Sequence, residues 1–440
     1  MAAERGPKTD VGALIDGRPM SALQIGVVVL CSLTIFLDGY DIQVMALAVP
    51  SLAKEWSRPP SDFGWALSAA MVGLSVGSAG LGHFGDRLGR RTAVIAAMVL
   101  VGVTTTCTAF ATSPEQFIVW RFFTGIGLGV CVPNLNAWTS EYAPLRQRSL
   151  AVVSMNAAIA LGAFSAGFLA PPVIHLFGWR GIFLVGGIGP LIVAALLWLL
   201  APESLKFLMA RKPGDPRIAR TLARIAPGVD ASRVVLADAG GVRSGSALEL
   251  ISPAFRNRTL LLWAMAALNI FTLNVLIAWL PTLLGSAGWS PDHALQGAVT
   301  IQLGGIAGGI GLSFFLDRGL TRPSLAATWI LSAVVLLAFL VVPSSLVGWG
   351  LLLLAVGAGV SGSQLSLNAL SAAYYPPQIK ATGVGWVGLV GGSGAIAAGP
   401  VGAWLIGQGM GLTQVLAVLV IPVLLCAGGV VLMRREWQAH

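Results

Sequence analysis

The sequence predicts an all-α polytopic membrane protein with twelve transmembrane helices in two six-helix halves and both termini in the cytoplasm. Three observations support this fold class: only 10% of the 440 residues are charged while 56% are hydrophobic, long apolar runs recur, and the two halves repeat each other. A soluble domain carries about 25% charged residues, so a water-soluble fold would have too few charges to cover its surface. The net charge of +9 is spread over short loops rather than one patch, which argues against nucleic-acid binding.

Twelve apolar runs are long enough to cross a bilayer, because about 20 residues at 1.5 Å each span a hydrocarbon core of about 30 Å. The runs cover residues 23–50, 62–84, 91–111, 115–138, 149–172, 180–201, 259–284, 294–316, 323–343, 346–372, 381–406 and 411–433. The first run is not a cleavable signal peptide, since it is long and contains Asp38 and Asp41. The four cysteines lie inside apolar runs and the four histidines are scattered, so neither disulfides nor a metal site is expected.

The basic residues set the expected orientation. With the N-terminus inside, 23 of the 27 Lys and Arg residues fall in cytoplasmic segments, as the positive-inside rule requires. The chain then divides into a cytoplasmic tail (1–22), a first six-helix half (23–201), a cytoplasmic linker (202–258), a second half (259–433) and a cytoplasmic tail (434–440). The linker holds ten basic and five acidic residues. A solvated connector is favoured there over surface helices such as one around residues 217–225.

Two motifs of the first half recur in the second half. Asp86 in the loop after the second run matches Asp317 after the eighth, 231 positions later. Tyr142 after the fourth run matches Tyr375 after the tenth, 233 positions later. Two motif pairs at nearly one offset indicate a parallel duplication, an arrangement in which a solute site lies between two halves that rock about it.

The loop between the second and third runs carries the strongest local motif. Glycines allow a tight turn there, the aspartate can accept hydrogen bonds from a helix N-terminus, and the arginines can pair with acids such as Glu141. An ordinary positive-inside loop is the alternative, but it would not require this ordered spacing. The residues expected to form a cytoplasmic gate are Gly82, Asp86, Arg87, Gly89, Arg90, Arg91 and Glu141, with Asp317 and Arg318 in the second half.

Residues 82–91 match the signature loop G-x3-D-R-x-G-R-R of the major facilitator superfamily at every fixed position. The spans, linker and repeat extend this resemblance to almost the whole chain. A finer resemblance lies in the Asp38-Gly39-Tyr40-Asp41 element, which is similar to the aromatic acid:proton symporters of that superfamily. Five further stretches support it: 121–129, 133–134, 140–144, 279–284 and 381–385. The resemblance implies inward transport of a benzoate-like carboxylate, such as hydroxybenzoate, protocatechuate, gentisate or phenoxyacetate, together with protons.

Asp38 and Asp41 are the candidate proton-coupling residues. Each ionised acid near the bilayer midplane is costly unless it is paired, hydrated or protonated, and a spacing of three places both on one helix face. The alternative is that they are structural acids paired with a neighbour. Arg121 is the candidate anion ligand, since its guanidinium can hold a carboxylate through two parallel hydrogen bonds. We expect Arg121 to pair with Asp41 or Asp38, either as a site that substrate enters or as a purely structural ion pair.

Amide side chains and one indole complete the candidate substrate site. An amide in a membrane helix more often joins helices than binds a ligand, and aromatic residues are ordinary filling, so a packing role is the alternative for each. The candidates are Asn136, Asn274, Gln302, Gln364, Asn368 and Trp279, beside Arg121 and Asp41.

Three functional classes follow from these residues. The first is a proton-coupled importer of an aromatic carboxylate in a bacterial inner membrane, with a monomer sufficient for the mechanism and protons in place of any cofactor. The second is a proton-coupled exporter of drugs or organic anions, although the fifth run lacks the Gly-Pro step that exporters of this superfamily tend to carry. The third, a membrane enzyme or sensor, is disfavoured because no nucleophile motif, nucleotide-binding loop or signalling domain is present.

Overall fold

The computed structural model describes residues 9–229, 234–236, 247–376 and 379–433 of the chain. Within these residues, eleven helices are long and apolar enough to cross a membrane. Those of the first half are α2 (Ala22–Glu55), the stretch Pro60–Leu81 that contains α3 (Gly64–Val76), α5 (Arg90–Ala109), α6 (Pro114–Tyr142) and α7 (Leu145–Leu200). Those of the second half are α10 (Arg256–Ser286), α11 (Pro291–Asp317), α12 (Thr321–Ala338), α13 (Leu346–Tyr374), α14 (Lys380–Gly407) and α15 (Leu412–Leu432). The all-helical membrane fold predicted from the sequence is confirmed.

Helix α7 covers two of the predicted runs. Its 56 residues are interrupted at Gly178, whose φ of 66° and ψ of −174° are not helical and mark a kink between two helices. A positive φ of this size is accessible to glycine without the steric cost that a side chain would add. The two parts of α7 correspond to the predicted runs 149–172 and 180–201, and the twelve crossings stay an expectation.

The packing inside each half follows the predicted repeat. In the first half α2 packs on α7, α3 on α6 and α5 on α7, and in the second half α10 packs on α14, α11 on α13 and α12 on α15. Glycines allow the closest of these approaches: a Cβ on Gly39 of α2 would collide with the Ile159 carbonyl of α7, and one on Gly162 of α7 with the Phe36 carbonyl of α2. The α2–α7 contact therefore brings two backbones together.

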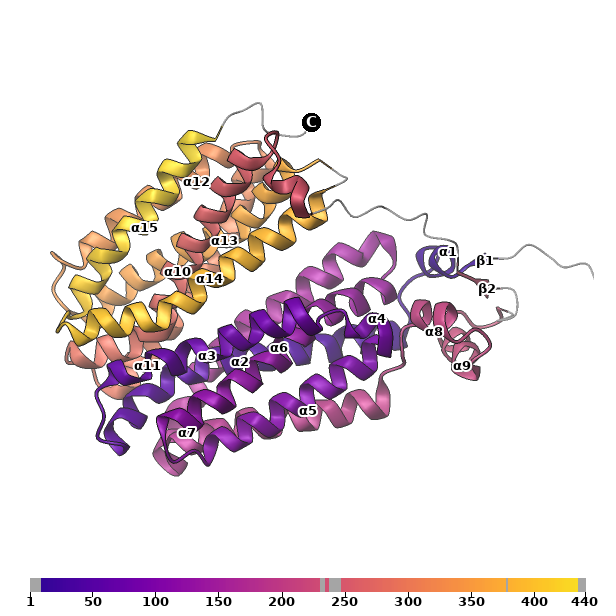
Figure 1. The fold of residues 1–440 in the computed structure, drawn as a ribbon, viewed down its shortest axis with the longest axis horizontal. Coiled ribbons are helices and arrows are strands. Elements are labelled where there is room, and N and C mark those ends of the chain that lie inside the picture. The colour runs from indigo at the N-terminus through magenta and orange to yellow at the C-terminus, as the bar shows by residue number, and fades with distance from the viewer. Residues whose placement is uncertain (1–8, 230–233, 237–246, 377–378, 434–440) are drawn as a thin grey trace, which may run out of the picture.

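The two halves touch mainly at one end of the molecule. Ser68 Oγ at the start of α3 donates to the Ile396 carbonyl of α14 at 2.6 Å, and His175 Nε2 of α7 lies 3.2 Å from Asp292 Oδ1 of α11. Figure 1 shows the two helical groups approaching each other at this end and diverging toward the other end, where the described linker residues 205–225 lie. We call the end at which the halves touch the opposite end, and the end at which they diverge the linker end.

Short elements at the linker end correct the expectation of a solvated connector. They are β1 (Thr9–Asp10), α1 (Val11–Asp16), α4 (Phe84–Leu88), α8 (Leu205–Arg211), α9 (Pro216–Ile225), β2 (Val234–Val235) and the 3-10 turn η4 (Ala247–Ile251). Two further turns flank α3: the 3-10 turn η1 (Pro60–Phe63) precedes it at the opposite end, and the π-helical turn η2 (Gly77–Leu81) extends it toward α4.

The first part of the linker is packed rather than solvated. Leu208 of α8 and Leu222 of α9 are buried in one apolar cluster with Val11 of α1, and β1 pairs in parallel with β2. Residues 216–225 form helix α9, although the sequence analysis favoured a solvated connector over a helix here. The helix is stabilised because Ile218, Leu222 and Ile225 share a buried face. Hydrogen bonds from Arg217 lower the pKa of Asp215, the N-cap of α9, to about 2, so this cap stays ionised.

Candidate functional site

The acids of α2 lie deep in the first half. Ser21 caps α2 in a capping box with Gln24, and the helix then runs unbroken through Asp38 and Asp41, each about 3% exposed. Arg121 of α6 donates to both carboxylate oxygens of Asp41, from Nη1 to Oδ1 at 2.8 Å and from Nη2 to Oδ2 at 2.7 Å. The expected pairing of Arg121 with an acid of the first helix is thereby confirmed, and Asp41 is the partner.

This ion pair is almost completely buried. Arg121 is 1% exposed, its guanidinium carbon lies 6.0 Å from the ring centre of Phe183, and its Nε has no hydrogen-bond partner among the described residues. A buried pair of this kind costs about 3–5 kcal/mol when one partner is removed, because the other charge is left uncompensated. The pair is therefore stable only while both charges, or substitutes for them, are present.

Asp38 differs from Asp41 in having no such partner. Its Oδ1 is buried and makes no hydrogen bond within the described part of the chain. An ionised carboxylate in this position would be costly, since burial of a charge without a counter-charge is strongly unfavourable. The two acids of one helix thus occupy different environments: Asp41 is ion-paired, and Asp38 has no charged partner among the described residues.

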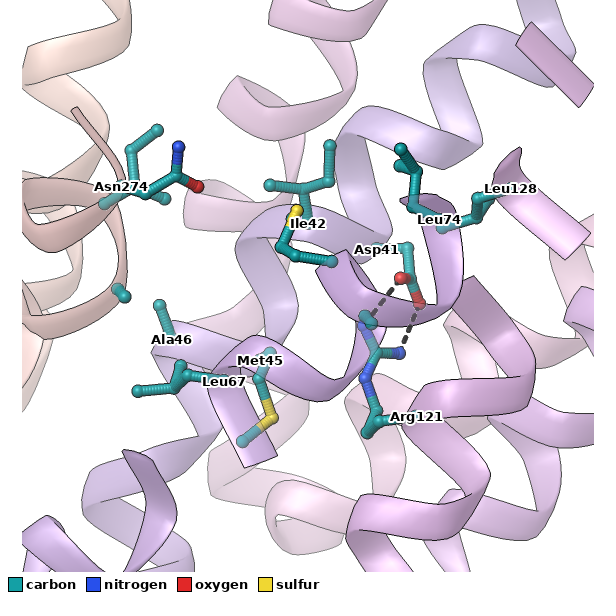
Figure 2. Close-up of a pocket in the computed structure, with 13 residues that line it drawn as sticks. Asp41, Ile42, Met45, Ala46, Leu67, Leu74, Arg121, Leu128 and Asn274 are labelled. Atoms are coloured by element: carbon teal, nitrogen blue, oxygen red, sulfur yellow. Dashed lines mark hydrogen bonds and ion pairs between the residues drawn. The ribbon is translucent and has the colours of Figure 1, made fainter. Parts of the chain in front are cut away.

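A cavity lies against the ion pair and draws its walls from both halves. Figure 2 shows Asp41 and Arg121 joined on one side and Asn274 of α10 on the other. The lining residues come from α2, α3, α6 and α10: Asp41, Ile42, Met45, Ala46, Leu67, Ala70, Met71, Leu74, Arg121, Leu128, Asn274, Ile277 and Ala278. The cavity measures about 30 Å³, room for one or two water molecules. An aromatic ring can enter only if these helices or side chains move.

The other candidate ligands divide between this cavity and helix contacts. Asn274 lines the cavity and donates to the Ile270 carbonyl of its own helix at 2.9 Å. Asn136 of α6 accepts a hydrogen bond from Asn156 of α7 at 2.8 Å. Trp279 is fully buried and donates to the Gly399 carbonyl of α14 at 3.2 Å, away from the cavity lining.

The remaining amides belong to α11 and α13. Gln302 of α11 is half-buried and outside the cavity lining. Gln364 and Asn368 of α13 lie one helical turn apart, with Gln364 Nε2 donating to Asn368 Oδ1 at 3.4 Å. Gln364 also accepts from Asn269 of α10 at 2.9 Å, a residue that the sequence analysis did not single out.

The residues that the sequence analysis expects to form a gate in the first half make a charged cluster at the linker end. Arg90 lies 2.5 Å from Asp86 and its Nε lies 3.4 Å from Glu141 Oε1, the acid expected to receive an arginine. Gly89 has a φ of 100°, which lets the chain turn sharply between α4 and α5. The Gly82 carbonyl accepts a hydrogen bond from Asn134 of α6 at 2.9 Å, and Arg87 is exposed.

Glu203 is the acid of this cluster that sequence reasoning missed. It is 6% exposed, and its Oε1 accepts from the backbone N–H of Arg91 at 3.0 Å. Ser204 donates to Glu141, and Tyr142 donates to the Glu203 carbonyl at 2.8 Å. The available signal is the Pro-Glu-Ser step directly after the sixth run, which hydropathy alone assigns to the start of the linker.

Of the two residues expected to form a gate in the second half, only Arg318 has a described side-chain contact. The guanidinium carbon of Arg318 lies 3.8 Å from the ring centre of Phe314, and the Asp317 side chain lies outside the described residues. The charged cluster of the first half therefore has no described counterpart in the second.

Two repeated groups of membrane helices, with a buried charge pair beside a cavity that both groups line, define the class of polytopic transport proteins. The chain belongs to the Major Facilitator Superfamily, whose family model matches residues 31–400. It is accordingly a membrane transporter rather than an enzyme, and the recognition of this superfamily from the loop motif is confirmed.

The chain is also similar to individual transporters of known name. The chain is 34% identical over 429 residues to the 4-hydroxybenzoate transporter PcaK of Pseudomonas putida, covering 97% of this chain and 96% of that one. It is 35% identical over 416 residues to the gallate transporter of Pseudomonas putida, covering 94% and 92%. The fold also resembles the inward-open xylose transporter XylE from E. coli, with a TM-score of 0.71 and 18% identity over 93% of this chain and 96% of that one.

Proposed function

We propose that this chain is a proton-coupled secondary transporter that imports an aromatic carboxylate by alternating access. The observation that carries the proposal is the buried two-point pair of Arg121 with Asp41 on the wall of a cavity shared by both halves. The relatives named for 4-hydroxybenzoate and gallate support a ring-bearing carboxylate as the substrate class. Benzoates with hydroxyl substituents are the first candidates.

The pair suggests how proton and substrate binding are coupled. A substrate carboxylate has the same two-oxygen geometry as Asp41, so it competes for the same guanidinium fork. A proton on Asp41 removes the internal competitor and frees Arg121 for the substrate. Asp38, three residues earlier and without a cation partner among the described residues, supplies the second proton position.

The cavity requires a rearrangement when substrate binds. Its volume of about 30 Å³ is too small for a benzene ring, so the helices around the Asp41–Arg121 pair must separate or repack. We assign Asn274, which faces the pair from the second half, to contact with the ring. Asn136 and Trp279, whose polar atoms already bond within their own halves, we assign to helix packing rather than to the substrate.

The linker end is proposed to be cytoplasmic, and the charged cluster there to be the inner gate. Arg90, Asp86 and Glu141 already form one network on the first half. Closing the gate then requires the second half to approach it, with Asp317 and Arg318 as the corresponding loop. The protein is placed in a bacterial inner membrane as a monomer, and it uses protons rather than a bound cofactor.

Uptake into proteoliposomes tests this function. Radiolabelled 4-hydroxybenzoate is offered outside vesicles that carry an imposed inward pH gradient, and accumulation is expected to need the gradient. Asp41→Asn is expected to lose uphill accumulation, because the pair no longer responds to protons. Glu55→Gln is the matched control, since it neutralises an acid of the same helix that is 42% exposed and pairs with Arg180.

Two results would contradict the proposal. Accumulation that ignores the pH gradient, or an Asp41→Asn protein that still concentrates substrate, would exclude proton coupling through this acid. Net efflux from loaded vesicles under the same gradient, without uptake, would instead indicate an exporter. Folding of each variant is checked by thermal unfolding of the purified protein.

A further inference from the structure

Asn269 joins three helices of the second half through its side chain. It is 1% exposed. Its Oδ1 accepts from Trp329 Nε1 of α12 at 2.9 Å, and its Nδ2 donates to Gln364 Oε1 at 2.9 Å and to the Val360 carbonyl of α13 at 3.2 Å. Gln364 Nε2 then donates to Asn368 Oδ1 at 3.4 Å. Four side chains thus form one continuous hydrogen-bonded chain from α12 to α13.

The direction of this chain is fixed at its buried end. An indole N–H can only donate, so Trp329 obliges Asn269 to present its oxygen to α12 and its amide N–H groups to α13. Gln364 must then accept through Oε1, which turns its own amide N–H groups toward Asn368. The Asn368 oxygen accepts the hydrogen bond from Gln364, so the Asn368 amide N–H groups are left at the open end. The chain ends in hydrogen-bond donors.

The open end lies on an exposed part of α13. Gln364 is half-buried and Asn368 is exposed. An exposed amide facing hydrocarbon would be costly, and polar groups in membrane helices face the interior of the bundle or a water-filled space. We therefore place this end toward the space between the two halves.

The position of Asn269 matches that of the proton-coupling acid in the other half. It lies 231 residues after Asp38, the offset that relates Asp86 to Asp317. It also lies five residues before Asn274, which lines the cavity opposite Asp41 and Arg121. Five residues of helix rise about 7.5 Å, comparable with the distance across a benzene ring and its para substituent. Five residues also turn the helix by about 140°, so Asn274 faces the cavity while Asn269 faces α12 and α13. The amide chain is thus offset along α10 from the cavity by about the length of one substrate.

We propose that the chain Trp329–Asn269–Gln364–Asn368 recognises the ring substituent opposite the substrate carboxylate and selects substituents that accept a hydrogen bond. Gln364 and Asn368 contact the substituent, while Trp329 and Asn269 are positioning residues that fix the direction of the amides. This inference rests on the proposed function. It predicts preference for 4-hydroxy and 4-methoxy groups over hydrogen or methyl at the same position.

Trp329→Phe tests the direction of the chain, because it removes the N–H that fixes Asn269 and keeps most of the ring. The KM for uptake of 4-hydroxybenzoate and 4-methoxybenzoate is expected to rise about tenfold, the effect of losing one oriented hydrogen bond. The KM for benzoate and 4-methylbenzoate, and kcat for all four acids, should stay unchanged. Trp349→Phe is the matched control, since that indole donates to the Val342 carbonyl within the same half.

Asn269→Asp is a second variant that is expected to reverse the chain. The carboxylate introduced at this position still accepts from Trp329 but cannot donate, so Gln364 turns its N–H groups toward that carboxylate. Asn368 must then donate to Gln364, which leaves the Asn368 oxygen at the open end. Selectivity should shift toward 4-aminobenzoate, whose substituent donates, and away from 4-methoxybenzoate. This change of preference is a result that mere loss of stability would not produce.

The outcomes separate this inference from the proposed function. If Trp329→Phe changes the KM of all four acids equally, or of none, the chain does not recognise the substituent. If wild-type protein takes up none of the four acids, the proposed function itself is contradicted. Wild-type uptake of benzoate with an unaltered substituent preference in both variants would overturn only the role of the amide chain.

Discussion

Arg121 is the residue on which the candidate site depends most. Its two terminal nitrogens hold two oxygens of one carboxylate in a plane, a geometry that a point charge cannot reproduce. Because the pair is buried, the guanidinium always needs an anion beside it. That anion is Asp41 in this conformation, and the proposed cycle exchanges it for substrate.

Arg121→Lys is expected to keep the charge and the fold but to weaken substrate binding by about tenfold or more, since one of two parallel hydrogen bonds is lost. The measurement is the Kd of purified protein for 4-hydroxybenzoate, taken by calorimetry. Arg180→Lys serves as the control, because the Arg180 side chain is 41% exposed, makes one hydrogen bond, to Glu55, and stacks on Trp179 at the surface, far from the buried pair in sequence and burial. Equal affinities of Arg121→Lys and wild type would remove Arg121 from the binding site.

At the scale of elements, the contact of α2 with α7 sets where the acids lie. Gly39 lies between Asp38 and Asp41 in sequence, and its missing side chain lets α2 approach the Ile159 carbonyl. Gly162 performs the same role from α7 toward the Phe36 carbonyl. The acids are thus placed by a backbone contact that admits no side chain on either surface.

Gly162→Ala is expected to destabilise the protein by about 1–3 kcal/mol, the usual effect of overpacking a tight contact. Gly26→Ala in α2 is the matched control: a Cβ there meets nothing within 4 Å, and helix propensity should make it neutral or stabilising by about 1 kcal/mol. Thermal unfolding in detergent measures both. A Gly162→Ala protein as stable as Gly26→Ala would show that the two helices are not held this closely.

At the scale of the whole molecule, the structure is closed at the opposite end and its two halves diverge at the linker end (Figure 1). His175 and Asp292 lie across the closed end, 3.2 Å apart between α7 and α11. Alternating access requires this contact to open when the linker end closes. The contact therefore belongs to one state of the cycle.

A disulfide between His175→Cys and Asp292→Cys is expected to trap that state. Oxidation should reduce uptake by more than about tenfold, and reduction should restore it, because the opposite end can no longer open. Each single cysteine variant is the control, and the native cysteines among the described residues are buried or half-buried within helices. Verified cross-linking that leaves uptake intact would mean that this end does not open during transport.

The sequence predicted most of the fold because lipid imposes strong rules. Helix length and the sparse charges follow from the thickness and low polarity of the bilayer, and the repeated loop follows from the duplication of one six-helix unit. The prediction for the linker was wrong because Leu208 and Leu222 are buried in an apolar cluster that includes Val11, about 200 residues earlier in the chain. Local composition cannot report such a distant partner, so the basic residues of the segment suggested a solvated connector.

For the candidate site, the sequence by itself determined which residues are available. Asp38, Asp41 and Arg121 stand out because charges inside membrane helices are costly and therefore few. Only the tertiary structure decided that Arg121 pairs with Asp41 and not with Asp38, that Trp279 packs away from the cavity, and that Asn269 joins three helices. The physical reason is that composition and hydropathy act along one helix, whereas pairing depends on the rotation and depth of neighbouring helices, which close packing of distant segments sets.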